Sequence, residues 1–94
     1  MKEQVKKLLR KYNVYWHMPV QNGMGAPSLD FVCCVRGRYF AVETKAGSKA
    51  LTPRQEETSA AIRKAKGKVF HVNEVNSGFS NLECWLQEVC DDEN

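Results

Sequence analysis

The sequence lacks several features that define whole classes of protein. None of its apolar runs approaches the roughly 20 residues that a membrane-spanning helix needs. Residues 1–12 are charged at helical spacing and have no apolar centre like that of a signal peptide. The chain also has no CxxC pair and no Cys/His spacing typical of a zinc site. We therefore expect a cytoplasmic protein with no membrane partner and no structural zinc.

Lysine and arginine are absent from the last part of the chain. All 14 lie in residues 1–68 beside five acids, a balance of +9, whereas residues 69–94 hold six acids and no base, a balance of −6. A basic body suits a polyanion such as nucleic acid, although a solvated basic helix face has the same composition. The length of 94 residues and the 43 % hydrophobic content predict a single domain over 1–94.

Cysteine is limited to positions 33, 34, 84 and 90. An even number of cysteines is compatible with a disulfide framework. Cys33 and Cys34 are adjacent in an expected strand, however, so their side chains point to opposite faces. We therefore interpret the four cysteines as buried free thiols in a reducing compartment.

Periodicity and capping signals predict an α/β fold with the order α-β-β-β-α-β-α, in which helices pack against a mixed sheet. Helical spacing of apolar residues marks 2–12 and the stretch after Ser80. Strands are expected near 14–19, 29–35, 39–45 and 68–72, and a loop at 20–28.

Two further helix starts are predicted from capping boxes. Thr52 is an N-cap followed by Pro53, and Gln55 completes a T-x-x-Q capping box. This helix is expected to run to about Lys66 and to end at Gly67. Ser80 and Glu83 form a similar pattern ahead of the last helix.

The stretch DFVCCVRGRYFAVETK reads as two strands joined by a short turn. Strand side chains alternate between faces, so Glu43 and Lys45 share one face. With a two-residue loop, Asp30 lies across from Glu43 if the loop begins at Arg36, and across from Lys45 if it begins at Gly37. Both registers put the three charges on one face, whereas a three-residue loop would separate them.

Two carboxylates and one ammonium group on a single face have two interpretations. Carboxylates brought together repel unless a cation lies between them. A hard ion such as Mg²⁺ is satisfied by one or two carboxylates together with water and phosphate oxygens. The alternative is a surface salt bridge at the strand ends, which contributes roughly 0–1 kcal/mol.

The run from GAPSLD through RGRYFAVETKAG to TPRQ resembles the VRR-NUC nucleases of the PD-(D/E)xK superfamily. The shared pattern is an acid after a proline, a strand turn, E-x-K, and a Gln that opens the next helix. The resemblance covers most of the chain and implies a restriction-endonuclease-like fold with an α-β-β-β-α-β core and a C-terminal helix. One departure is that Ser28 and Leu29 separate Pro27 from Asp30.

The resemblance also implies roles for individual residues. Asp30 and Glu43 match the metal-binding acids, Lys45 the catalytic lysine and Gln55 the catalytic helix glutamine, with Mg²⁺ or Mn²⁺ as cofactor. Glu3 is similar to an acid that these nucleases place near the metal. Both Gln55 and Glu3 have a purely structural alternative, because Gln55 completes a capping box and an acid is favoured in the first turn of a helix.

Basic residues outside this motif are candidates for phosphate contacts: Lys6, Lys7, Arg10, Lys49, Arg54 and Arg63. Lys64 and Lys66 are candidates too, although cations near a helix C-terminus also complement the helix dipole. His17 is a candidate general base, but a single His at a strand end is more often structural.

The charged face and the resemblance together predict a metal-dependent DNA endonuclease, and the resemblance implies that it leaves 5′-phosphate ends. Its expected substrates are duplex or branched DNA, including four-way (Holliday) junctions, in replication, recombination or repair. The resemblance further implies a homodimer and a bacterial or phage-infected cell, with an apolar patch on the first or last helix as a dimer surface. The alternatives are a non-catalytic nucleic-acid-binding module that retains the nuclease fold, and a purely structural partner protein.

Overall fold

The structure, a computed structural model, describes residues 1–20 and 28–91. Its elements follow the predicted order, and their bounds are α1 (Lys2–Lys11), β1 (Tyr15–His17), β2 (Phe31–Val35), β3 (Arg38–Thr44), α2 (Pro53–Lys64), β4 (Lys68–Val72) and α3 (Gly78–Asp91). Nearly all of the loop predicted at 20–28 lies outside the described residues.

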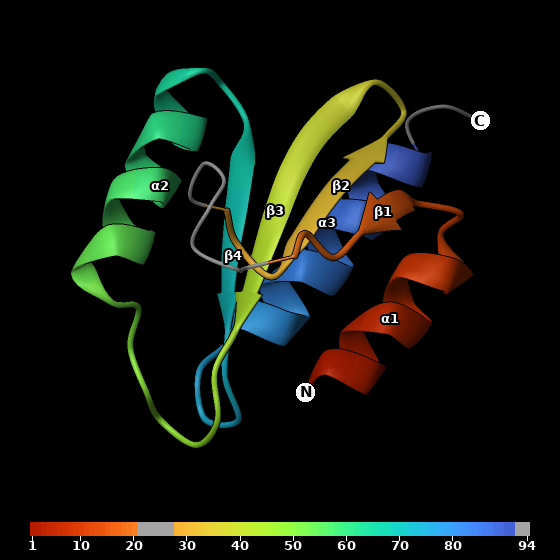
Figure 1. Cartoon of the computed structure of the whole chain (residues 1–94). Helices are drawn as coiled ribbons and strands as arrows, with labels where there is room; N and C mark the ends of the chain where they lie inside the picture. Colours follow the sequence, from red (N-terminus) through yellow and green to blue (C-terminus); the bar gives the residue numbers. More distant parts are fainter. Residues whose placement is uncertain (21–27, 92–94) are drawn as a thin grey trace.

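The four strands form one mixed sheet in the order β1-β2-β3-β4. The first three strands are antiparallel neighbours, whereas β4 runs parallel to β3 after a crossover through α2. In Figure 1, α2 covers one face of the sheet while α1 and α3 lie on the other. The predicted α/β fold with a mixed sheet and a C-terminal helix is therefore confirmed.

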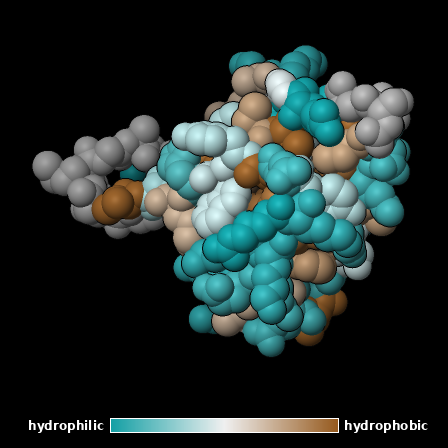
Figure 2. Space-filling model, turned by 90° about the vertical axis from the view of Figure 1, so that its right-hand side faces the viewer, coloured by the Kyte–Doolittle hydropathy of each residue, from teal (hydrophilic) through white to brown (hydrophobic). Residues whose placement is uncertain are grey.

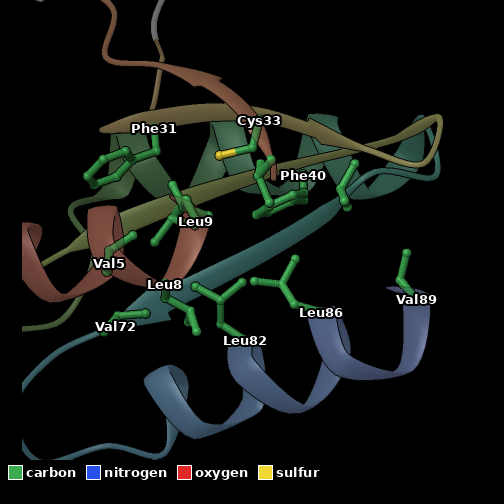
Figure 3. Packing of buried hydrophobic residues seen from close by; sticks show 13 residues of the cluster. Val5, Leu8, Leu9, Phe31, Cys33, Phe40, Val72, Leu82, Leu86 and Val89 are labelled. Carbon is green, nitrogen blue, oxygen red and sulfur yellow. The ribbon is translucent and has the colours of Figure 1, made fainter. Parts of the chain in front are cut away.

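The hydrophobic core fills the space between the sheet and the pair α1 and α3 (Figure 3). Each helix contributes the apolar stripe that its spacing predicts, with Leu9 on α1 and Leu86 on α3 fully buried. From the strands, Phe31 and Phe40 reach the same cluster and are also fully buried. Because the core uses this face of β2 and β3, their remaining side chains point toward α2.

Helix α2 begins as predicted and ends earlier than predicted. Thr52 Oγ1 accepts a hydrogen bond from the Gln55 backbone, and Gln55 Oε1 accepts one from the Thr52 backbone, which completes the capping box. The helix ends at Lys64 and not near Lys66, because Lys66 adopts a left-handed φ of 75°. The Gly67 amide then bonds back to the Ile62 carbonyl at 2.9 Å, as in a Schellman motif.

Gly67 follows the left-handed position instead of occupying it, and its role is steric. A Cβ at Gly67 would come within 2.7 Å of the Ile62 side chain and 3.0 Å of Tyr39. The chain therefore needs glycine here so that the end of α2 can approach β3 closely.

The prediction that Ser80 caps the last helix is wrong. Helix α3 begins at Gly78, so Ser80 lies inside its first turn. Asn76 Oδ1 accepts a hydrogen bond from the Gly78 amide at 2.9 Å, and the Ser77 carbonyl accepts the first helical bond from Asn81. The Ser80–Glu83 pattern is a local match that this stronger side-chain cap overrides.

The other sequence-based expectations for the surface have mixed outcomes. All four cysteines are free, as expected, but the expectation that they are buried is wrong for Cys34 and Cys84, which are exposed. Cys33 is buried and Cys34 is not, because adjacent strand residues point to opposite faces. Burial raises the pKa of the Cys33 thiol to about 12. The large apolar side chains that are exposed in the described residues lie on strands and loops, among them Tyr15 and Tyr39, and not on α1 or α3 as expected. Within the described residues, no helix has the length and apolar character to span a bilayer.

Candidate active site at the end of β3

The hairpin register places Asp30 beside Glu43. Phe31 pairs with Val42, and the Arg36–Gly37 turn closes the hairpin with both residues at positive φ. This is the first of the two registers considered from the sequence, and Asp30 directly precedes Phe31, the first residue of β2. The Asp30 backbone amide donates a hydrogen bond to Glu43 Oε1 at 3.0 Å, which fixes the two acids at one end of the sheet.

Glu43 is a buried carboxylate, only 4 % exposed, on the face of β3 that looks toward α2. Both of its oxygens accept hydrogen bonds, one from the Asp30 amide and one from the Gln55 side chain. Burial and, secondly, the negative charge of Asp30 raise its pKa, whereas the Asp30 amide and the charges of Lys45 and Lys2 lower it. A buried acid next to a second acid is stabilised by a cation, which makes the pair a candidate metal centre.

Asp30 is held in place by Thr44. Its Oδ2 atom accepts a bond from the Thr44 hydroxyl at 2.8 Å and another from the Thr44 backbone amide at 3.1 Å. Thr44 was not singled out from the sequence. The signal that could have found it is its position between the E and K of the E-x-K motif, although an alternating strand would put that residue on the opposite face.

Gln55 makes both of the contacts that the sequence left as alternatives. Its amide nitrogen donates to Glu43 Oε2 at 3.0 Å, while its amide oxygen accepts from the Thr52 backbone at 3.0 Å. The helix cap thus fixes the direction in which the Gln55 amide points. One residue therefore links the start of α2 to the buried carboxylate.

Lys45 follows β3 directly and is half-buried. Its backbone amide donates to the Val72 carbonyl at 2.9 Å, which ties this end of β3 to the end of β4. Its positive charge is among those that lower the pKa of Glu43, so it lies within electrostatic reach of that carboxylate. The E-x-K residues and Asp30 are therefore brought to one site.

Glu3 is not brought into this group. Its carboxylate accepts from Lys6 Nζ at 3.1 Å, its side chain is largely exposed, and this ion pair lowers its pKa. Among the described residues, no three His, Cys, Asp or Glu side chains come together as a metal-binding cluster. Two carboxylates, those of Asp30 and Glu43, are sufficient for Mg²⁺ or Mn²⁺, because these ions often keep several waters and bind through one or two carboxylates.

The candidate phosphate contacts are spread over several surfaces. Lys7 and Arg10 lie on the exposed side of α1, where hydrophilic residues dominate (Figure 2), and the Arg10 guanidinium lies 5.7 Å from the centre of the Trp16 ring. Lys49 and Arg54 are exposed on the loop before α2 and in its first turn, which also carries Gln55. Arg63 lies two turns further along α2, about 12 Å from Gln55.

Lys6 and His17 take no part in the two hydrogen bonds described for Glu43. Lys6 is half-buried and paired with Glu3. His17 is exposed on β1, where it pairs with Val32 and packs near the ring of Tyr15. The general-base role of His17 remains a prediction.

A hydrogen-bonded link between two loops supports this end of the sheet and was missed in the sequence. The buried Asn73 donates through Nδ2 to the Lys49 carbonyl at 3.2 Å, and His71 Nε2 lies 3.1 Å from the same oxygen. The Gly47 amide donates to the Glu74 carboxylate at 3.0 Å. These bonds hold the loop that carries Lys49 against the loop that follows β4.

The comparisons with known proteins bear on the fold. No protein-family model matches the chain, and no curated protein sequence matches it. A solved structure is similar: Hjc, a Holliday junction resolvase from the archaeal hyperthermophile Archaeoglobus fulgidus, with a TM-score of 0.59 and 17 % sequence identity. The match covers 77 % of this chain and 63 % of the resolvase, so the chain spans less than two thirds of its neighbour's length. The chain therefore has the restriction-endonuclease-like fold that its sequence predicts.

Proposed function

We propose that the protein is a metal-dependent DNA endonuclease that hydrolyses phosphodiester bonds in branched or duplex DNA. The observation that carries the proposal is the pair Asp30 and Glu43 at the end of β3, held by four hydrogen bonds, one of which joins the Asp30 amide to the Glu43 carboxylate. A similar fold in a Holliday junction resolvase supports a structure-specific substrate such as a four-way junction.

The residues of the site divide the chemistry between them. Asp30 and Glu43 would hold Mg²⁺ or Mn²⁺, which when bound lowers the pKa of water and stabilises negative charge on a phosphate. Thr44 and Gln55 orient the two carboxylates. Lys45 supplies a positive charge beside the phosphate, where the bond from water to phosphorus forms as the bond to the leaving 3′ oxygen breaks. The products would carry 5′-phosphate ends.

Burial of Glu43 favours this proposal over a non-catalytic nucleic-acid-binding module. An acid held in a buried site beside a second acid is unfavourable for folding and for contact with phosphate. A module that only binds DNA gains nothing from the arrangement. A Mn²⁺ titration by calorimetry separates the two, since the nuclease requires a site that Glu43→Ala removes.

The remaining parts of the proposal concern assembly and setting. A homodimer would present two sites to the two strands of a branched substrate, and its mass in solution is measurable by light scattering. A VRR-NUC nuclease of phage or bacterial type acting in the cytoplasm is consistent with the E-x-K, hairpin and helix-glutamine motifs. A purely structural partner protein, in contrast, would show no DNA affinity even at low salt.

The test is cleavage of a labelled four-way junction and a matched linear duplex with Mn²⁺, Mg²⁺ or EDTA. Lys45→Ala controls for a contaminating nuclease, and its fold is checked by circular dichroism. Metal-dependent cleavage that disappears in the variant supports the nuclease. Binding without cleavage, equal in wild type and variant, would leave a DNA-binding module.

A further inference from the structure

A cluster of cations lies at the end of the sheet opposite to Asp30 and Glu43. Strands β3 and β4 are parallel, so the hairpin turn before β3 and the turn between α2 and β4 meet at the same end (Figure 1). Six exposed basic side chains occupy these turns and their flanks, and we call them the basic pole: Arg36, Arg38, Arg63, Lys64, Lys66 and Lys68.

The surface of the basic pole is concave. An open hollow of about 430 Å³ is lined by Arg38, Lys66 and Lys68 together with Tyr39 and Trp85. A second hollow of about 530 Å³ is lined by Lys66 and Lys68 again, together with Arg63. Lys66 and Lys68 thus line both hollows, and four of the six cations of the pole line at least one of them.

Two of these cations occupy backbone positions that disfavour them. Arg36 has a φ of 52° at the first position of the hairpin turn, where Asn, Asp or Gly is preferred. Lys66 has a φ of 75° at the helix end, where Gly or Asn is preferred. The other non-glycine residue with positive φ in the described chain is Asn13, an ordinary choice. Positive charge therefore stands at both strained positions of this pole.

Local structure accounts for only part of the cluster. Arg63 and Lys64 lie in the last turn of α2 and complement its dipole, and the Arg38 guanidinium donates to the Arg36 carbonyl at 3.2 Å, but the Arg36 side chain has no such role. No ion pair with another described residue is seen for Arg36, Arg63, Lys64, Lys66 or Lys68. Their charges are therefore unneutralised by the part of the protein that the structure describes.

We propose that the basic pole binds the sugar–phosphate backbone of duplex DNA as a second contact surface, separate from the carboxylate pair. This inference rests on the proposed function for its choice of polyanion. Arg38 and Glu43 are five residues apart on β3, about 17 Å, whereas Lys68 pairs with Phe40 and is closer to Glu43. The distance from Arg38 is about twice the Debye length of about 8 Å at physiological salt, so a loss of charge in the turns beyond it, at Arg36 and Lys66, should leave Glu43 unperturbed.

The strained positions allow a test in which charge is removed without harming the fold. Arg36→Asn with Lys66→Asn deletes two cations and installs the residue that these φ values prefer. Arg36→Lys with Lys66→Arg keeps both charges and serves as the matched control. Binding of wild type and both variants to a labelled duplex of about 30 base pairs is measured by fluorescence anisotropy over a salt series in EDTA, which prevents cleavage.

We expect the Asn variant to melt at or above the wild-type temperature and to bind roughly tenfold more weakly near 0.15 M salt. The slope of log affinity against log salt should fall by about 1.8, which is two contacts at about 0.9 each, while the control keeps the wild-type slope. If the Asn variant had the same affinity and salt slope as the wild type, the proposal that the basic pole binds DNA would be overturned. The nuclease proposal would remain intact. Absence of wild-type binding to any DNA would overturn both. Retained binding without metal-dependent cleavage would overturn the nuclease alone.

Discussion

The side chains of Gln55 and Glu43 are joined directly, with 3.0 Å between the donating Nε2 and the accepting Oε2. The same Gln55 side chain accepts a hydrogen bond from the Thr52 backbone, so the helix cap and the candidate active site share one residue. The folding of α2 and the direction of the Glu43 carboxylate therefore depend on each other.

Gln55→Glu separates these two roles. A glutamate at this position keeps the capping box but replaces the amide donor with a second acid facing Glu43. We expect helix content close to that of the wild type and DNA cleavage at least tenfold slower. Thr52→Ser is the control, since it preserves the cap and the Gln55 amide. Unchanged cleavage in Gln55→Glu would show that Gln55 acts only as a cap.

Glu43 gives the stability of the protein a specific pH dependence. Its pKa in the fold is raised above the ordinary value of 4.5, so the folded state holds its proton more tightly than the unfolded state. The stability that Glu43 contributes through this shift in pKa is fully present below about pH 4.5 and is lost as the pH rises through the folded pKa. The free energy of unfolding of wild type and Glu43→Gln can be measured with denaturant between pH 4.5 and 7. As the pH falls, the wild type should gain stability relative to the variant. A pH-independent difference would contradict the assignment.

Thr44 is expected to act through Asp30. Thr44→Val removes the hydroxyl that bonds Asp30 Oδ2 at 2.8 Å and nearly keeps the volume of the side chain. Loss of such a supporting bond typically weakens metal binding by about 10–100-fold. A Mn²⁺ titration by calorimetry measures this directly, and excess Mn²⁺ should recover much of the cleavage rate. Unchanged Mn²⁺ affinity would mean that the hydroxyl does not position Asp30.

Ser59 offers a stabilising substitution. It is fully buried on α2, and its hydroxyl has no hydrogen-bond partner among the described residues. Ser59→Ala should raise the free energy of unfolding by about 1 kcal/mol, because the desolvated hydroxyl is removed. That gain corresponds to a melting temperature higher by roughly 4–8 °C. Ser80→Ala, at an exposed position inside α3, reports the effect of helix propensity alone and should be smaller.

Gly67 and Gly47 are expected to respond differently to the same substitution. Gly67→Ala places a methyl group 2.7 Å from the Ile62 side chain and should destabilise the protein by about 1–3 kcal/mol. Gly47 has free space around it but a φ of 59°, so Gly47→Ala should lose only about 1 kcal/mol through backbone strain. Thermal unfolding of both variants makes the comparison. A larger loss at Gly47 would contradict the steric role of Gly67.

The parts of the structure that were predicted correctly depend on local signals. The capping box at Thr52 and Gln55 is complete within four residues, so tertiary packing had nothing to override. The strands and the apolar stripes of α1 and α3 could be predicted from the periodicity of apolar residues along the sequence. The register of Asp30 against Glu43 followed once the turn was known to begin at Arg36.

The parts that could not be predicted depend on contacts between distant segments. The Schellman end at Lys66 requires Gly67 at the next position because of Ile62 and Tyr39, which no local pattern reveals. The start of α3 at Gly78 depends on close approach to the His71 carbonyl, where a Cβ would collide with the backbone. Likewise, the bond from Asn73 to Lys49 spans 24 positions of the sequence.

Helix α2 is anchored at both ends, by its capping box at Thr52 and by the Schellman motif at Lys66. From Gln55 to Lys64, α2 therefore forms a rigid spacer of about 14 Å between the Gln55 contact and the basic pole. Successive phosphates of one DNA strand advance by about 3.4 Å along the duplex axis. A backbone held at the pole would thus meet the carboxylate pair about four nucleotides away, and α2 would act as a molecular ruler for the position of the cut.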